Sequence, residues 1–133
     1  MSQDKQEREF KELGILLERA WSRATSADPH NWSRKNPAWG QCAVTACIVQ
    51  DQFGGTLLRV NVFVPEVSEP ISHYFNQLPD GSVIDLTRKQ FPDGALFSPP
   101  QERTRQYVLD PKFTTRKRYM LLKRRLRKCL NGK

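Results

Sequence analysis

The stretch that decides the fold spans residues 39–46 and reads WGQCAVTA. Positions 40 to about 52 predict a helix, which the pair Gly54-Gly55 ends. Apolar and small side chains occupy nearly all of its faces, as in a helix that is buried on every side. Its small residues let neighbouring strands approach closely. The stretch therefore predicts a central buried helix whose first turn carries Cys42.

The position of Cys42 at a helix start favours thiol chemistry. A cysteine attacks carbonyl groups as the thiolate, and the unpaired amides and positive dipole end of a helix N-terminus stabilise an anion. The amide of Cys42 can also bind the oxyanion of a tetrahedral intermediate. The alternative is that Cys42 is an ordinary buried cysteine. Side-chain donors for the oxyanion are further candidates: Gln41, Asn36 and Trp39.

A predicted hairpin places a histidine beside a carboxylate. Strands are expected at 56–64, 71–78 and 82–87. The turn Pro79-Asp80-Gly81 favours a three-residue loop that ends in a left-handed glycine. In that register His73 and Asp85 become diagonal neighbours on one face of the sheet, roughly 7 Å apart at their backbones. A two-residue loop would instead put them on opposite faces.

Together these segments supply a thiol, an imidazole and a carboxylate in the order Cys42, His73, Asp85. In such a set the carboxylate fixes the tautomer and orientation of the histidine, which activates the thiol. The competing interpretations are a strand histidine with ordinary partners and an aspartate that binds local backbone. Asn76 is either a polar residue of an edge strand or a substrate contact. Cys47 points to another side of the helix, so we expect it to pack in the core.

Four segments carry a resemblance to known families: WGQCAVTA, QDQFGG, SHYFN and IDLTRKQF. The Gly-Gln-Cys sequence at a helix start, followed by SHYFN and Asp85 in successive strands, looks like the core of the transglutaminase-like superfamily. More closely, the four segments resemble the bacterial YunG family. The resemblance implies a papain-like fold with a catalytic triad of Cys42, His73 and Asp85, and it implies no particular substrate.

Three positions depart from the superfamily patterns. Transglutaminases usually carry Trp at the positions of Ala43 and Phe75. Papain-like enzymes place the oxyanion glutamine six residues before the cysteine, where this chain has Asn36.

The flanking segments predict two further helices. Residues 4–25 show apolar positions at helical spacing, and residues 110–130 begin with Asp-Pro, a favourable helix start. A loop is expected at 88–100 and a short extended piece at 106–109. The fold class expected is α+β: a papain-like (transglutaminase-like) core with a buried helix packed on a small antiparallel sheet, flanked by N- and C-terminal helices. Residues 37–91 would form the catalytic core of a single domain, 1–133.

Composition restricts the possible function classes. The chain has 133 residues with 38% hydrophobic and 27% charged side chains, as expected of one globular domain. No apolar run approaches the roughly 20 residues of a membrane span, and the first residues do not resemble a signal peptide. We therefore expect a cytoplasmic protein without a transmembrane segment. Three cysteines without a Cys-x-x-Cys pair, and two distant histidines, predict no metal site and no cofactor.

The charge of the chain is concentrated near its C-terminus. The net charge is +8, and residues 111–133 hold ten of the 22 Lys and Arg residues but none of the 14 Asp and Glu residues. An apolar stripe on the same helix predicts docking on the domain. The basic face is then either solvated or attracts nucleic-acid phosphates, an acidic protein or an anionic membrane surface.

The sequence therefore supports two hypotheses of different classes. In the first, Cys42 attacks a peptide, amide or ester carbonyl, His73 protonates the leaving group and Asp85 orients His73. Hydrolysis is favoured over transfer to an amine because no amine site is evident. In the second, the chain is a non-catalytic binding module whose residues 112–133 contact nucleic acid or an acidic partner. The oligomeric state is left open.

Overall fold

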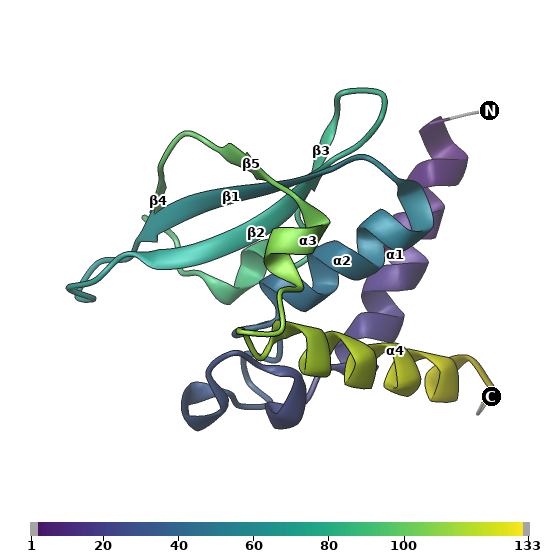
Figure 1. Ribbon diagram of the computed structural model, residues 1–133, viewed down its shortest axis with the longest axis horizontal. Coiled ribbons are helices and arrows are strands. Elements are labelled where there is room, and N and C mark those ends of the chain that lie inside the picture. The colour runs from purple at the N-terminus through teal and green to yellow at the C-terminus, as the bar shows by residue number, and fades with distance from the viewer. Residues whose placement is uncertain (1–2, 132–133) are drawn as a thin grey trace.

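The computed structural model describes residues 3–131, and within them it has the α+β class (Figure 1). The helices are α1 (Gln3–Ala20), α2 (Cys42–Phe53), α3 (Arg105–Val108) and α4 (Thr115–Asn131). The strands are β1 (Thr56–Phe63), β2 (Ile71–Gln77), β3 (Val83–Ile84), β4 (Leu96–Phe97) and β5 (Gln101–Arg103). Short 3₁₀ helices lie in the loops: η1 (Arg23–Thr25), η2 (Pro29–Asn31) and η3 (Arg88–Gln90). Among the described residues, no helix is both long and apolar enough to cross a bilayer.

The sheet is antiparallel and is built around β1. Its order is β3-β2-β1-β4, while β5 pairs with an earlier part of β1 than β4 does. The β1–β2 ladder places Val60 opposite His73. Strand β3 pairs with β2 only at Asn76 and Gln77. Because β3 is so short, the chain leaves the sheet just before Asp85, and Asp85 and Phe91 then contact His73 in the first half of β2.

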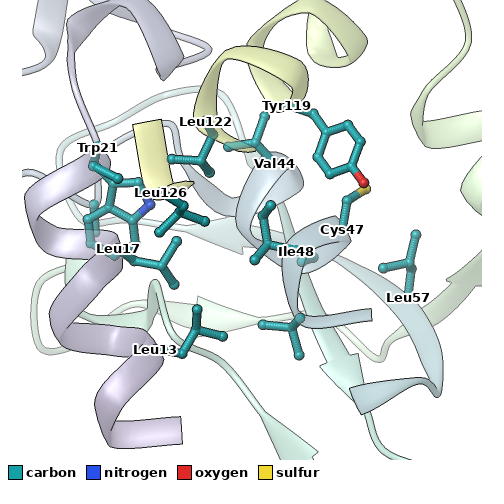
Figure 2. Close-up of a cluster of buried hydrophobic side chains, with 14 of the residues drawn as sticks. Leu13, Leu17, Trp21, Val44, Cys47, Ile48, Leu57, Tyr119, Leu122 and Leu126 are labelled. Atoms are coloured by element: carbon teal, nitrogen blue, oxygen red, sulfur yellow. The ribbon is translucent and has the colours of Figure 1, made fainter. Parts of the chain in front are cut away.

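Helix α2 is the centre of the molecule, as its sequence predicts. In Figure 1 it lies between the sheet and α4, with α1 standing at its side. Figure 2 shows side chains from α1, α2 and α4 converging on one cluster. Leu17, Val44, Leu57 and Leu122 are fully buried there. Burial of each such side chain contributes about 1.5–3 kcal/mol, so this cluster fixes the position of α2 and its first turn.

A second apolar cluster lies on the other face of the sheet. It is formed by Val60, Val62 and Phe91, with Phe75 and Phe97 packed against them. The side chains of β1 alternate between the two clusters, because its valines face this one while Leu57 belongs to the first. The ring of His73 contacts the phenylalanines of this second cluster.

The N-terminal helix ends five residues earlier than predicted, at Ala20 rather than at residue 25. Local hydrogen bonds explain the difference. The hydroxyl of Thr25 accepts from the amide of Ser22 and donates to the side chain of Gln41. Residues 22–25 therefore form a turn that contacts the start of α2, instead of another turn of α1.

The C-terminal helix begins at Thr115, not at residue 110. The carboxylate of Asp110 accepts from the amide of Lys112 at 2.9 Å, and the carbonyl of Asp110 accepts from Phe113, so this Asp-Pro pair makes a turn rather than a helix cap. The extended piece expected at 106–109 was also wrong, since those residues belong to α3 and the turn after it, and the strand lies just before them.

Candidate functional site

The hairpin between β2 and β3 has the predicted register. Asn76 pairs with Ile84, and the amide of Leu78 donates to the carbonyl of Ser82 at 2.8 Å. Gly81 closes the turn with a φ of 90°, a conformation that glycine adopts without steric cost. The loop therefore has three residues, the length that was expected to bring His73 and Asp85 together on one face of the sheet.

His73 and Asp85 form a direct pair. The Nε2 atom of His73 lies 2.6 Å from Oδ2 of Asp85. The other carboxylate oxygen of Asp85 accepts from the amide of Thr87 at 3.2 Å. This second contact fixes the carboxylate, which in turn sets the orientation of the ring and makes Nε2 its donor nitrogen.

The surroundings of His73 favour its charged form. The side chain is fully buried, and its ring stacks on Phe75 and meets Phe91 and Phe97 edge-on, with centroids 4.9 to 6.0 Å away. Burial alone opposes protonation. The hydrogen bond to Asp85 and the contact with Cys42 outweigh it, and together they raise the pKa of His73 to about 9.

The second ring nitrogen of His73 is the one available to the thiol. Within residues 3–131, Nδ1 is buried and has no hydrogen-bond partner of normal geometry. The Cys42 side chain nevertheless lies close enough to help raise the pKa of His73 by hydrogen bonding. The ring of His73 therefore binds Asp85 through Nε2, lies near the side chain of Cys42, and keeps Nδ1 as the nitrogen available to a thiol.

Cys42 is the first residue of α2 and is half-buried. Its Sγ atom lies 3.9 Å from the carbonyl oxygen of Ser72, on the strand that carries His73. The first amides of a helix have no partner within it, so the backbone here presents donors and the positive end of the helix dipole to the sulfur. The arrangement can hold a thiolate–imidazolium pair next to backbone donors.

The residues just before Cys42 build this helix start. Gly40 has a φ of 73°, and a Cβ atom at that position would lie 2.2 Å from the Ser26 hydroxyl. Gln41 is fully buried: its amide group donates to the carbonyl of Ser22, and its Oε1 accepts from Thr25. These bonds use the Gln41 side chain to anchor α2 to residues 22–26. The placement favours a structural role for Gln41 over the expected role as an oxyanion donor.

The other side-chain candidates also donate to groups of the protein itself. Asn36 donates to the carbonyl of Gln90 at 3.1 Å, and the indole of Trp39 donates to Asp28 at 3.1 Å. Asn76 is buried and donates to the carbonyl of Ala46 at 2.9 Å, which ties β2 to α2. None of these contacts places a side-chain donor beside Cys42. The backbone amides of the first turn of α2 are therefore the better oxyanion donors.

Two cavities reach the site from different sides. The larger one, about 720 Å³, lies between α1 and residues 85–93 and includes Asp85 but not Cys42. The smaller one, about 320 Å³, contains Cys42 and is lined by residues of β1, β2, α3 and α4. A substrate must meet the sulfur atom, so the smaller cavity is the candidate substrate site despite its size.

Sequence reasoning missed the contribution of the C-terminal helix to this cavity. Arg118 of α4 and Arg59 of β1 both line it. A signal for Arg118 exists, because it precedes Leu122 and Leu126 at intervals of four residues and thus belongs to the inner stripe of the helix. No comparable pattern distinguishes Arg59 from other strand residues.

These features define a small α+β protein in which Cys42, at the start of a central helix, lies near a His73–Asp85 pair. Residues 9–131 match the family model described as YunG protein, so the chain belongs to the YunG family. A relative from Bacillus subtilis (strain 168), described as "Uncharacterized protein YunG", is 37% identical over 76 residues, which are 57% of each protein. The chain thus spans little more than half the length of this curated relative. No solved structure matches the chain.

Proposed function

We propose that the protein is a thiol-dependent acyl-transfer enzyme that hydrolyses an amide or ester through Cys42, His73 and Asp85. The proposal rests on the pair of His73 with Asp85 and on the proximity of Cys42, which helps to raise the pKa of His73. A strand histidine with an ordinary structural role would have its buried nitrogens satisfied, whereas Nδ1 here has no hydrogen-bond partner among residues 3–131. The resemblance of the Gly-Gln-Cys and SHYFN segments to the transglutaminase-like superfamily, with its papain-like fold, supports the same assignment.

The chemistry follows from the placement of the three groups. The Cys42 thiolate attacks the carbonyl carbon, an S–C bond forms, and the negative charge moves to the oxygen beside the first amides of α2. The imidazolium of His73 then gives its Nδ1 proton to the leaving amine or alcohol as the C–N or C–O bond breaks. Water attacks the thioester, His73 accepts its proton, and the acid and the thiolate are released. Asp85 holds the ring through Nε2 in both steps.

The proposal is tested by the pH dependence of iodoacetamide labelling, followed separately for each cysteine by peptide mass spectrometry. An activated pair makes Cys42 react quickly at neutral pH, and the variant Asp85→Asn should slow it by about tenfold or more because the imidazolium is then less stable. Cys47 and Cys129 serve as controls in the same chain, since burial raises the pKa of Cys47 to about 12. Labelling of Cys42 with the pH profile of a free thiol, unchanged in Asp85→Asn, would contradict the proposal.

A second candidate function rests on the exposed cations of α4. Arg116, Lys117, Arg124, Arg127 and Lys128 are exposed, and within residues 3–131 none of them pairs with a carboxylate. Such a face can hold an anionic partner, nucleic acid above all. Deletion of the helix would remove the core residues Leu122 and Leu126, so the appropriate variant replaces the five cations with glutamine. Binding to a DNA duplex that falls with salt and is lost in this variant would favour the second function.

A further inference from the structure

The cavity at Cys42 is basic and has no acidic residue in its lining. Arg59 and Arg118 line it together with aromatic and small side chains, and no Asp or Glu is among them. Within residues 3–131, Asp85, Glu18 and Asp51 are paired with His73, Lys89 and Arg105, and neither Arg59 nor Arg118 takes part in an ion pair. Two guanidinium groups therefore share a cavity with the thiol and have no carboxylate partner among the described residues.

Arg118 is held in the protein by neutral groups only. Its Nη1 donates to the carbonyl of Thr25 at 3.2 Å, and Nε and Nη2 donate to the hydroxyls of Thr114 and Thr115 at 3.1 and 3.2 Å. These bonds use three of the five N–H groups of a guanidinium. Burial lowers the pKa of Arg118, while negative charge on Cys42 acts in the opposite direction. A partly buried cation of this kind gains most from an anionic partner.

Arg59 reaches the same cavity from the sheet. Its Nε donates to the hydroxyl of Ser72 at 2.9 Å, and no other bond from its guanidinium to the described residues is made at normal geometry. Ser72 is also the residue whose carbonyl oxygen lies near the sulfur of Cys42. Arg59 and Cys42 therefore both contact Ser72: Arg59 binds its hydroxyl, and the sulfur of Cys42 lies near its carbonyl oxygen.

We propose that this cavity recognises a carboxylate carried by the substrate within a few bonds of its scissile carbonyl. Arg59 and Arg118 bind the carboxylate, and Cys42 attacks the carbonyl. The identity of the reaction rests on the function proposed above, but the anion site does not. A volume of about 320 Å³ is at the small end of ligand sites, and Tyr74, Tyr107 and Phe113 add aromatic walls. These dimensions fit a peptide end or one acidic residue rather than a folded protein.

The test compares two reagents that share an electrophile and differ in charge: iodoacetate, which carries a carboxylate, and iodoacetamide, which is neutral. The rate ratio of iodoacetate to iodoacetamide at Cys42 is divided by the same ratio for N-acetylcysteine amide, a neutral free thiol. We expect a preference for iodoacetate of roughly tenfold or more, because a hydrogen bond to a charged group contributes about 1.5–3 kcal/mol.

Variants connect the preference to the two arginines. Arg118→Gln and Arg59→Gln should each lower the ratio several-fold, and Arg118→Lys should retain part of it. The matched control is Arg124→Gln, which removes the same charge from an exposed position of α4 and should leave the ratio unchanged. If Arg118→Gln fails to fold, Arg59→Gln and the wild-type ratio still decide the question.

Protection experiments then identify the source of the carboxylate. N-acetyl-dialanine with a free C-terminus, its C-terminal amide, and N-acetylglutamate α-amide are each tested for slowing iodoacetamide labelling of Cys42. Protection by the first indicates a chain terminus, and protection by the third indicates an acidic side chain. Equal protection by the neutral amide would overturn the inference, as would a normalised ratio near one or a ratio that falls equally in Arg124→Gln.

The two proposals can fail separately. If Cys42 prefers iodoacetate but is not an activated thiol, the anion site is supported and the proposed enzyme activity is contradicted. If Cys42 is activated but shows no such preference, the proposed enzyme activity is supported and recognition of a substrate carboxylate is contradicted.

Discussion

Two polar clusters lie against opposite ends of α2, and they differ in how completely their groups are paired. Near the end of the helix, Arg105 donates to the carbonyl of Cys47, the side chain of Gln50, the carboxylate of Asp51 and the hydroxyl of Tyr119. The Tyr119 hydroxyl donates to Asp51 in turn. Every charge in this cluster has a counter-charge and hydrogen-bond partners, and together they join α2, α3 and α4.

At the start of the helix the pairing is incomplete. Asp85 is bound to His73, but Nδ1 of His73 has no hydrogen-bond partner in the described part of the chain. A buried polar atom without a partner costs free energy, typically 1–3 kcal/mol. The fully paired cluster is explained by stability alone. The incompletely paired one is less stable than it could be, as expected of a reactive site.

Of the variants that distinguish the reactive cluster from the fully paired one, Cys42→Ser is expected to have the largest effect on reactivity. A hydroxyl replaces the nucleophile at a half-buried position, so the free energy of unfolding should change by less than about 1 kcal/mol. Acylation by p-nitrophenyl acetate, a simple activated ester, should fall to background, since loss of the nucleophile removes the covalent path. The measurements are the release of nitrophenol and urea unfolding of the same samples. If the Cys42→Ser variant is still acylated at the site, Cys42 is not the nucleophile.

Gly40→Ala tests whether the start of α2 depends on its backbone conformation. A left-handed φ together with a close approach to Ser26 should cost about 2–4 kcal/mol of stability. Labelling of Cys42 should also lose its dependence on His73 as the first turn moves. The control is Gly14→Ala, at a helical position with open space around it, which should stabilise the protein by about 1 kcal/mol. Equal effects of the two substitutions would show that the conformation at Gly40 is not required.

The raised pKa of His73 predicts how stability depends on pH. A histidine whose pKa rises from 6.5 to about 9 on folding stabilises the protein fully below pH 6.5, and this contribution disappears as the pH rises through 9. The difference in unfolding free energy between wild type and His73→Gln should shrink between pH 6 and pH 10, by on the order of 3 kcal/mol at most. Urea unfolding across that range measures it. A difference that grows with pH would mean that folding lowers the pKa of His73 instead of raising it.

The smallest effect on the reactivity of Cys42 is expected from a change in the fully paired cluster. Tyr119→Phe removes the hydroxyl that joins Arg105 to Asp51, and it should destabilise the protein by about 1–2 kcal/mol. The iodoacetamide profile of Cys42 should stay that of wild type. A change in the profile would show that the two ends of α2 are coupled, which contradicts the division into a structural and a reactive cluster.

Local signals account for the parts of the fold and site that the sequence predicts. The apolar run after Cys42 predicts a buried helix because apolar and small side chains occupy nearly all of its faces. The Pro-Asp-Gly turn determines the loop length, and the loop length alone determines that His73 and Asp85 share a face. These inferences need no knowledge of distant contacts, and the observed helix and register confirm them.

The parts that sequence reasoning misses depend on distant partners. The early end of α1 depends on Thr25 bonding to Gln41, sixteen residues away. The assignment of Gln41 as a candidate oxyanion donor overlooks that bond for the same reason. Arg118 contacts a cavity whose other walls come from the sheet and α3, so its role is visible only once those elements are placed.

The central claim is that a charged His73 lies between the Cys42 thiolate and Asp85, and nitrogen NMR of ¹⁵N-histidine-labelled protein tests it most directly. His30, exposed on η2, provides a reference signal in the same chain. The account predicts that both ring nitrogens of His73 stay protonated well above pH 7, with a midpoint near 9, and that Cys42→Ala lowers this midpoint. A His73 ring that is neutral at pH 7 and titrates identically in wild type and Cys42→Ala would contradict the pair, and with it the proposed enzyme.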